Sequence, residues 1–231
     1  MPPIWLTALA WIALASAFVS AAIIAYDIWG RGYRQRMGVM EPVWVVTALY
    51  FGPAAVWGYR RFGRQSSQRW LDEHHLQEPP GKPGWATVAV GVSHCGAGCT
   101  LGDIVAEWTV FLAGIAIAGE ALWAEFIGDY VLALALGLHF QYLAIAPMRG
   151  LGLWEGIKAA AKADVLSLTA FEVGLFGWMA LMSFVFFPAP HRLHPDSPVY
   201  WFGMQIGMVL GFFTAWPVNV WLIRKGIKEA M

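Results

Sequence analysis

The chain has 231 residues, of which 58% are hydrophobic and only 13% are charged, and its 15 Lys and Arg balance 15 Asp and Glu. A soluble domain carries about 25% charged residues, so the composition predicts a membrane protein whose main partner is the lipid bilayer. Zero net charge argues against a basic surface for nucleic acid. The sequence has no nucleotide-binding motif, and its two cysteines are too few for a disulfide framework.

Five stretches are apolar and long enough to cross about 30 Å of hydrocarbon. They are residues 4–26, 103–123, 127–146, 165–187 and 200–223. No basic residue precedes the first stretch, which we therefore expect to be a retained membrane helix and not a signal peptide. The stretch 42–59 is marginal because Gly52-Pro53 interrupts it, so it is either a sixth crossing or a re-entrant segment.

The predicted fold class is therefore all-α: a polytopic helical membrane protein with about six membrane helices, one of them a candidate re-entrant segment. Its expected organisation is an N-terminal membrane hairpin over residues 1–59, a cytoplasmic loop over 60–84 and a four-span core domain over 85–231.

Lys and Arg predict the orientation, because they gather in cytoplasmic loops. With six crossings, eleven Lys and Arg residues lie on the cytoplasmic side, and Arg31, Arg34, Arg36 and Arg192 lie on the opposite side. If 42–59 is a re-entrant segment, fourteen lie on the cytoplasmic side and one lies on the opposite side. Both alternatives remain open. Each predicts a multi-pass membrane protein with its loop 60–84 and its C-terminus in the cytoplasm.

The most informative stretch is Ser93-His94-Cys95-Gly96-Ala97-Gly98-Cys99-Thr100-Leu101-Gly102-Asp103, followed by Glu107. Cys95, Cys99, Asp103 and Glu107 recur every four residues, so they follow one face of a helix. Thiols, an imidazole and carboxyls are costly in hydrocarbon, and such residues in membrane segments usually serve a function. The alternative is close packing of small residues around two inert buried cysteines.

Residues 85–123 would form a helix about 58 Å long, which is longer than one crossing needs and shorter than two crossings. We therefore expect a half-helix, a break at Gly96-Ala97-Gly98 and then a full helix. Broken helices at membrane depth line cavities or bind ions. In this geometry His94 and both thiols would lie at a helix N-terminus, where the partial positive charge favours thiolate.

The ligand types point to a soft metal. Thiolate and imidazole suit Cu(I) or Zn(II), and His94, Cys95, Cys99 and Asp103 would supply four ligands. Met204 and Met208, four residues apart on the last helix, are candidate thioether ligands that bind Cu(I) and not Zn(II). Methionine pairs also fill gaps in membrane cores. The predicted ion is Cu(I), with Zn(II) as an alternative.

Further polar residues in the predicted spans are candidates for a proton or cation relay. They are Glu107, Asp164, Glu172 and His139. His139 is equally consistent with a hydrogen bond to a neighbouring helix, or with a haem held between His94 and His139. Gly203, Gly207 and Gly211 form a small-residue face for close approach of another helix, in this chain, in another membrane subunit or in a second copy of a homo-oligomer.

Several segments resemble one bacterial membrane family, catalogued as domain of unknown function 4396. The resemblance covers residues 85–231 and lies in the following segments: His94 to Asp103; Phe140-Gln141-Tyr142 through Arg149; Lys162 to Thr169; Met204 to Met208; and Pro217 to Trp221 through Met231. It implies a helical protein of the bacterial inner membrane and implies no activity.

Three functions remain. The leading hypothesis is a membrane protein that binds a soft metal and transports or delivers it, with Cys95 and Cys99 as core ligands. The second is a membrane redox protein based on haem or on thiols, although the CxxxC spacing differs from common CxxC redox motifs. The third is an assembly subunit without metal, in which the glycine faces pack helices. The sequence predicts no catalytic residue, so an enzyme is the weaker expectation.

Overall fold

The computed structural model describes residues 2–228, apart from the side chains of residues 146–149. Within residues 2–228 it contains helices and no β-strand. Five helices of this part of the chain are long and apolar enough to cross a membrane. They are α1 with its continuation η1 (Ile4–Gly30), α5 (Gly84–Ala113), α6 (Ala121–Arg149), α7 with η4 (Leu153–Phe186) and α8 (Pro198–Arg224). Such a set is typical of a multi-pass membrane protein.

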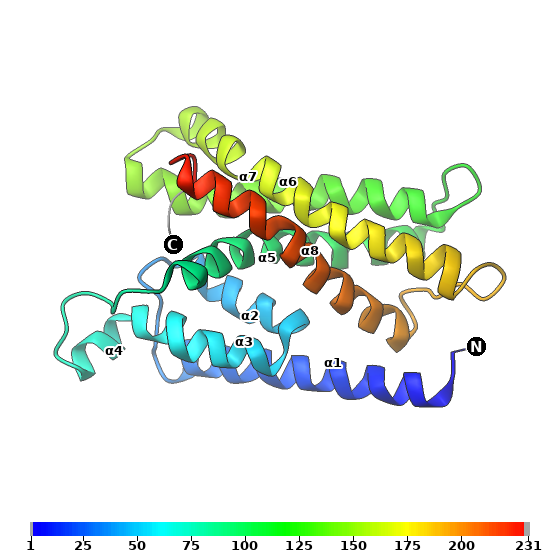
Figure 1. Ribbon diagram of the computed structural model, residues 1–231, viewed down its shortest axis with the longest axis horizontal. Coiled ribbons are helices and arrows are strands. Elements are labelled where there is room, and N and C mark those ends of the chain that lie inside the picture. The colour runs from blue at the N-terminus through cyan, green and yellow to red at the C-terminus, as the bar shows by residue number, and fades with distance from the viewer. Residues whose placement is uncertain (1, 229–231) are drawn as a thin grey trace.

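α5 is the central helix of the bundle (Figure 1). In its most apolar window 78% of the residues are buried, compared with 28–39% in the other four long helices. Protein therefore surrounds α5, while much of the surface of the other helices is left to lipid. This position explains how α5 can carry thiols and carboxyls, because polar residues in membrane segments face the bundle interior.

The expected break at Gly96-Ala97-Gly98 is wrong, since α5 is one continuous helix from Gly84 to Ala113. The glycines serve packing instead. A Cβ added to Gly98 would lie 2.7 Å from Gly137 Cα, and one added to Gly102 would lie 2.5 Å from Ala133 N. The backbones of α5 and α6 therefore touch along a Gly98-x-x-x-Gly102 face.

The predicted span 103–123 is wrong for the same reason. The long helix begins already at Gly84, nineteen residues before the predicted span. It ends at Gly114, whose left-handed φ of +64° favours glycine. A short turn then leads into α6. Within this turn the backbones of Ile117 and Glu120 form an isolated antiparallel β-bridge. The predicted spans 127–146, 165–187 and 200–223 fall within α6, α7 with η4, and α8 to within one residue, although all three helices begin earlier than predicted.

Residues 40–63 form a hairpin and not a sixth crossing. α2 (Met40–Phe51) runs into the bundle, the chain turns at Gly52 with φ +53°, and α3 (Pro53–Gly58) leads back to the same end (Figure 1). Ser16 Oγ, near the middle of α1, lies 3.5 Å from the position of a Cβ on Gly52, so the turn lies beside the middle of α1. The structure thus has five long apolar helices and this shorter helical hairpin within residues 2–228.

The turn of the hairpin leaves one backbone carbonyl without its helical partner. Leu49 would accept from the residue four positions later, but that residue is Pro53, which has no N–H. Gln205 on α8 donates its side-chain amide to the Leu49 carbonyl at 2.7 Å. This bond satisfies a group that lipid cannot satisfy, and it anchors the hairpin to the core helices.

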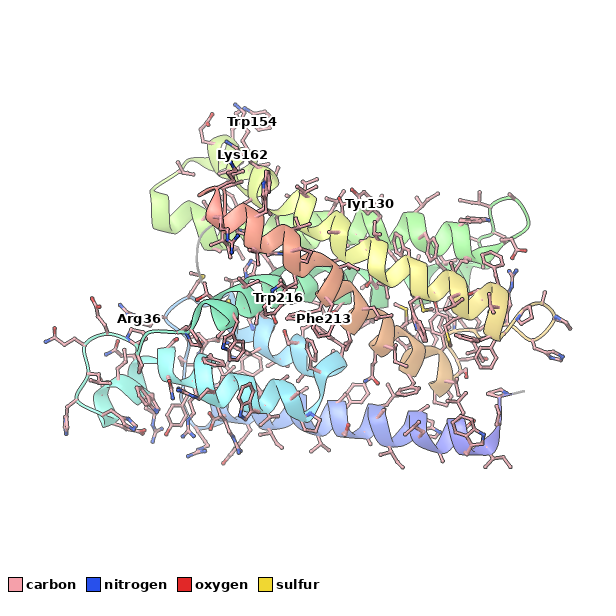
Figure 2. The ribbon with its side chains drawn as sticks, viewed as in Figure 1. Arg36, Tyr130, Trp154, Lys162, Phe213 and Trp216 are labelled. Atoms are coloured by element: carbon pink, nitrogen blue, oxygen red, sulfur yellow. The ribbon has the colours of Figure 1, made fainter. Side chains whose placement is uncertain are left out.

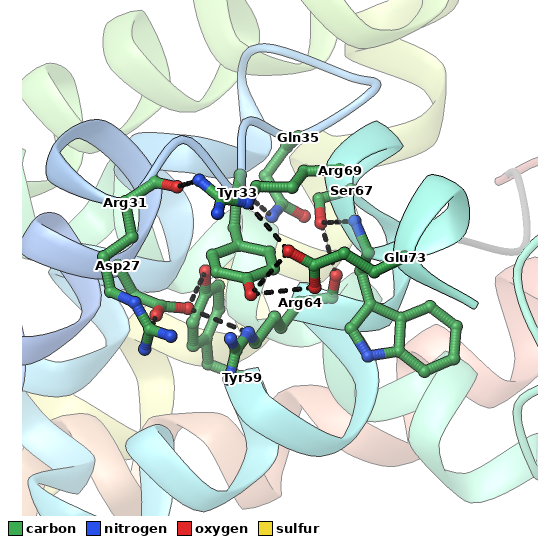
Figure 3. Close-up of polar contacts among 10 residues, drawn as sticks. Asp27, Arg31, Tyr33, Gln35, Tyr59, Arg64, Ser67, Arg69 and Glu73 are labelled. Atoms are coloured by element: carbon green, nitrogen blue, oxygen red, sulfur yellow. Dashed lines mark hydrogen bonds and ion pairs between the residues drawn. The ribbon is translucent and has the colours of Figure 1, made fainter.

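A polar clasp fixes the base of the hairpin to the end of α1 (Figure 3). The Asp27 carboxylate accepts a hydrogen bond from Tyr59 Oη at 3.0 Å and pairs with Arg64 at 3.3 Å. The Arg64 guanidinium also lies 3.8 Å from the centroid of the Tyr33 ring, and Tyr33 Oη donates to Glu73 at 2.9 Å. Residues before and after the hairpin are thus held together at one end of the bundle.

The basic residues gather at this same end. Figure 2 shows Arg36, Trp154 and Lys162 at the end of the molecule that also holds α4 (Gln68–Glu73) and the end of α8. Arg192 lies at the opposite end, in the connection between α7 and α8. Because the hairpin returns the chain to the end from which it started, fourteen of the fifteen Lys and Arg residues lie at this end of the bundle and one lies at the other.

Candidate functional site

The polar face of α5 is buried along its whole length. His94, Cys95, Cys99 and Asp103 have no exposed surface, and Glu107 is 2% exposed. The four-residue spacing turns the face slowly around the helix, so its members meet α6, α7 and α8 in turn. Both cysteines are free, as the sequence predicts.

At the basic end of the bundle, five side chains from α5, α7, α8 and the segment after α8 form a cluster, which we call the thiol–ammonium cluster. It comprises Cys95, Asp164, Ser167, Asn219 and Lys228. Lys228 Nζ lies 2.7 Å from Cys95 Sγ and 3.0 Å from Asp164 Oδ1, and neither Lys228 nor Asp164 has exposed side-chain surface. The Cys95 thiol also contacts Asp164 and lies 3.1 Å from Ser167 Oγ, which accepts a hydrogen bond from Asn219 Nδ2 at 2.6 Å.

One turn further along α5, the Cys99 thiol lies next to the Glu172 carboxyl of α7. Asp103 follows one turn later and faces Glu172 and Glu107. Within residues 2–228, neither oxygen of the buried Asp103 carboxyl has a hydrogen-bond partner. The same holds for both oxygens of the Glu172 carboxyl. A buried polar group without a partner is costly when it is charged, so these two acids favour their protonated, uncharged form.

At the end opposite the thiol–ammonium cluster, Glu107 lies beside Asp129 of α6 and the Tyr200 hydroxyl of α8. Glu125, one turn before Asp129 on α6, belongs to the same group. All three acids are buried, with exposures of 2% for Glu107, 2% for Asp129 and 6% for Glu125.

Together these groups form a continuous set of buried polar side chains along the axis of α5–α8, which we call the polar file. In order from the basic end, it contains Lys228, Asp164, Cys95, Cys99, Glu172, Asp103, Glu107, Asp129 and Glu125. From Cys95 to Glu107 the file rises by about 18 Å, and the hydrocarbon layer is about 30 Å thick. The file therefore spans more than half of the membrane core.

The charges along the file are unbalanced. Among the described residues of α5–α8 and the segment after α8, the buried charged side chains are six acids and one cation, Lys228. A carboxylate in low dielectric is stable only with a counter-charge close to it. A set of acids with this shortage of counter-charge must hold protons or other cations.

The expected four-ligand metal site is not assembled. Among the described residues, no three His, Cys, Asp or Glu side chains lie close enough together to hold a metal ion. Cys95 faces Asp164 and Lys228, Cys99 faces Glu172, and the His94 ring packs at 6.3 Å from the Phe140 ring centroid. On a continuous helix, Cys95 and Cys99 are separated by a rise of about 6 Å and meet different side chains of α7, while His94 lies about 100° around the helix from Cys95.

The other predicted site residues divide into two groups. Asp164 and Glu172 are members of the polar file, as a relay requires. Met204 and Met208 are buried beside it, and Met208 Sδ accepts a hydrogen bond from Thr100 at 3.6 Å. His139 instead lies on the exposed face of α6, so it belongs neither to the file nor to a haem site with His94.

The glycine face of α8 is used within the chain. A Cβ on Gly207 would lie 2.5 Å from a methyl of Leu175, and one on Gly211 would lie 2.6 Å from the Phe171 carbonyl oxygen, both on α7. Gly203 is also buried, against Met182. This face is therefore covered by α7 and is closed to a second copy of the chain.

Sequence reasoning missed five members of the site, namely Lys228, Asn219, Ser167, Asp129 and Glu125. Lys228 lies two residues after Gly226, and its signal was the glycine that ends α8 and turns the chain back. Asp129 had a signal in its spacing from Glu125, which places the two acids on one helical face. Ser167 offered no signal beyond its position three residues after Asp164.

Comparison with known proteins gives one match. No curated protein and no solved structure matches the chain. The family described as Domain of unknown function (DUF4396) matches residues 84–228, the segment that runs from the start of α5 to Lys228 and contains the whole polar file. The chain therefore belongs to the DUF4396 family.

Proposed function

We propose that this protein conducts protons through the membrane along the polar file of α5–α8. The observation that carries the proposal is the excess of buried acids over buried cations along that file. Intramembrane carboxyl groups that face a bundle interior are the usual elements of proton relays. The thiols and hydroxyls between them also donate and accept protons.

The spacing of the file suits proton transfer through bridging water. Residues four positions apart on a helix have Cβ atoms about 6 Å from each other, as do Cys99, Asp103 and Glu107 on α5. A single water molecule bridges two polar groups at this separation. Glu172 and Asp129, which approach from α7 and α6, shorten the steps further.

We infer that the end holding the thiol–ammonium cluster faces the cytoplasm. Fourteen of the fifteen Lys and Arg residues lie at that end, and such residues concentrate on the cytoplasmic side of bacterial membranes. Protons would then enter at Glu125 and Glu107 and leave past Asp164 and Lys228.

The proposal is tested by proton flux into liposomes that contain the purified protein and a pH-sensitive dye. Glu172→Gln keeps the shape of a residue at the middle of the file and removes its exchangeable acid. We expect the proton flux to fall about tenfold or more, because a positioned acid–base group typically contributes about 10²–10⁴ to the rate of a proton-transfer reaction. Glu155→Gln, an exposed acid on the same helix, is the matched control and should conduct like the wild type. Equal flux in both variants would contradict the proposal.

A second candidate cargo is Cu(I), and one observation favours it. Cys99, Met204 and Met208 belong to the same buried cluster of the core, which places soft sulfur ligands beside the file. Metal analysis of purified protein after exposure to Cu(I) under reducing conditions should then give bound copper. The Cys95→Ser/Cys99→Ser protein should have lost it. Copper retained by the double variant would exclude ligation by the thiols. If the folded wild-type protein showed no proton flux and bound no metal, the assembly-subunit hypothesis would be favoured.

A further inference from the structure

We propose that the thiol–ammonium cluster is a binding site for a monovalent cation of the ammonium type, and that Lys228 is a tethered occupant of this site. The inference rests on the proposed function in one respect only, because it assigns a cation site to the basic end of the polar file. Binding itself requires no proton flux.

The first argument is how Lys228 reaches the site. α8 ends at Arg224, and Gly226 with φ +66° reverses the chain. The Ile227 amide then donates to the Leu222 carbonyl and the Gly226 amide donates to the Ile223 carbonyl, each at 3.0 Å. These two bonds are the Schellman pattern that closes a helix C-terminus. The turn carries Lys228 back into the bundle, although a lysine at a helix end would ordinarily extend to the membrane surface.

The second argument is what the site offers to a cation. Asp164 supplies a carboxylate, and Cys95 supplies a sulfur at 2.7 Å from the ammonium nitrogen. Within the described residues, two further buried oxygens, Asp164 Oδ2 and Asn219 Oδ1, have no hydrogen-bond partner. Asn219 Oδ1 and Lys228 Cε both lie 4.0 Å from the position of a Cβ on Gly91, so both groups pack against the same part of α5.

The third argument is the chemistry of these donors. One carboxylate with neutral oxygen and sulfur atoms balances a single positive charge, and an ammonium group uses three N–H donors to contact them. A divalent ion would leave one positive charge uncompensated within the cluster, whose one acid among the described residues is Asp164. The site therefore suits ammonium or a primary alkylammonium, the chemical class that Lys228 itself presents.

A tethered occupant competes with any free cation. Lys228 is attached through a short turn, so its effective concentration at the site is high, and a free cation binds only when the turn opens.

Removal of the tethered ammonium should create a site for a free one. Lys228→Ala deletes the three remaining methylenes and the ammonium, a fragment that corresponds to propylammonium. We expect propylammonium chloride to raise the unfolding midpoint of purified Lys228→Ala by about 2–4 °C or more, and ammonium chloride to raise it less. The wild type and Lys225→Ala, which loses an exposed lysine of the same segment, should not respond.

Two controls separate recognition from cavity filling. Propanol has the same shape without the charge and should not stabilise Lys228→Ala. Asp164→Asn combined with Lys228→Ala should lose the response to propylammonium. If Lys228→Ala unfolds during purification, propylammonium added at cell lysis should allow its recovery.

The proposal is overturned if propylammonium neither stabilises nor recovers Lys228→Ala while Lys225→Ala is purified normally. Because this readout is the unfolding midpoint, it is independent of proton flux. A positive rescue with no flux would retain the cation site and reject the conduction pathway.

Discussion

Replacing Asp164 by asparagine is expected to lower the free energy of unfolding by about 3–5 kcal/mol, the usual cost of breaking a buried ion pair from one side. The Lys228 ammonium has no exposed side-chain surface and has Asp164 as its ion-pair partner. Without that carboxylate, the ammonium either stays buried without a counter-charge or pulls the C-terminal turn out of the bundle. The loss is measured by thermal or detergent-induced unfolding of the purified protein.

A compensating variant makes this prediction specific. Lys228→Met removes the charge and keeps a long side chain, so Asp164→Asn with Lys228→Met should recover most of the lost stability, since a buried pair is often replaceable by uncharged groups. Glu78→Gln, which neutralises an exposed acid, should change stability little. Equal losses in the single and double variants would show that Asp164 stabilises the bundle without Lys228.

Replacing Gly102 by alanine is expected to cost about 3 kcal/mol, at the upper end for an overpacked core. The added Cβ would lie 2.5 Å from Ala133 N and 2.8 Å from Leu132 C, which are backbone atoms that no rotamer change can move. α5 and α6 must therefore separate, and the polar face of α5 shifts with them. The unfolding midpoint of the purified protein measures the cost.

Gly177 provides the matched control. It lies within α7, and no atom lies within 4 Å of the position of its Cβ. Gly177→Ala should leave stability unchanged or raise it by up to about 1 kcal/mol, because alanine is the better helix former. If both substitutions had the same effect, the contact of α5 with α6 would not be the close backbone contact described above.

The sequence predicted the polar face of α5 and misjudged the helix that carries it. Hydropathy finds helices that face lipid, and α5 is surrounded by protein, so its most apolar window is less apolar than those of the other four long helices. A glycine-rich segment also has two meanings, a break or a close helix contact. The contact partners Ala133 and Gly137 decide between them, and they lie more than thirty residues away in the chain.

The same error displaced the acids at the far end of the file. Glu125 lies between the predicted spans 103–123 and 127–146, and Asp129 lies at the start of the second, whereas in α6 both acids are buried near Glu107. Lys228 was counted as a cytoplasmic anchor because a lysine after a final helix usually is one. Its burial depends on a backbone reversal at Gly226 and on a carboxylate 64 residues earlier, and spacing alone reveals neither.

The most direct test of the account is the reversal potential of the current through wild-type protein in a planar bilayer, with proton gradients imposed at equal concentrations of other ions. Conduction along the polar file predicts a current that depends on the protein, is lost in Glu172→Gln, and reverses at the proton equilibrium potential as the pH difference is varied. No protein-dependent current, or a reversal potential that follows the gradient of sodium, potassium or chloride instead, would contradict proton conduction.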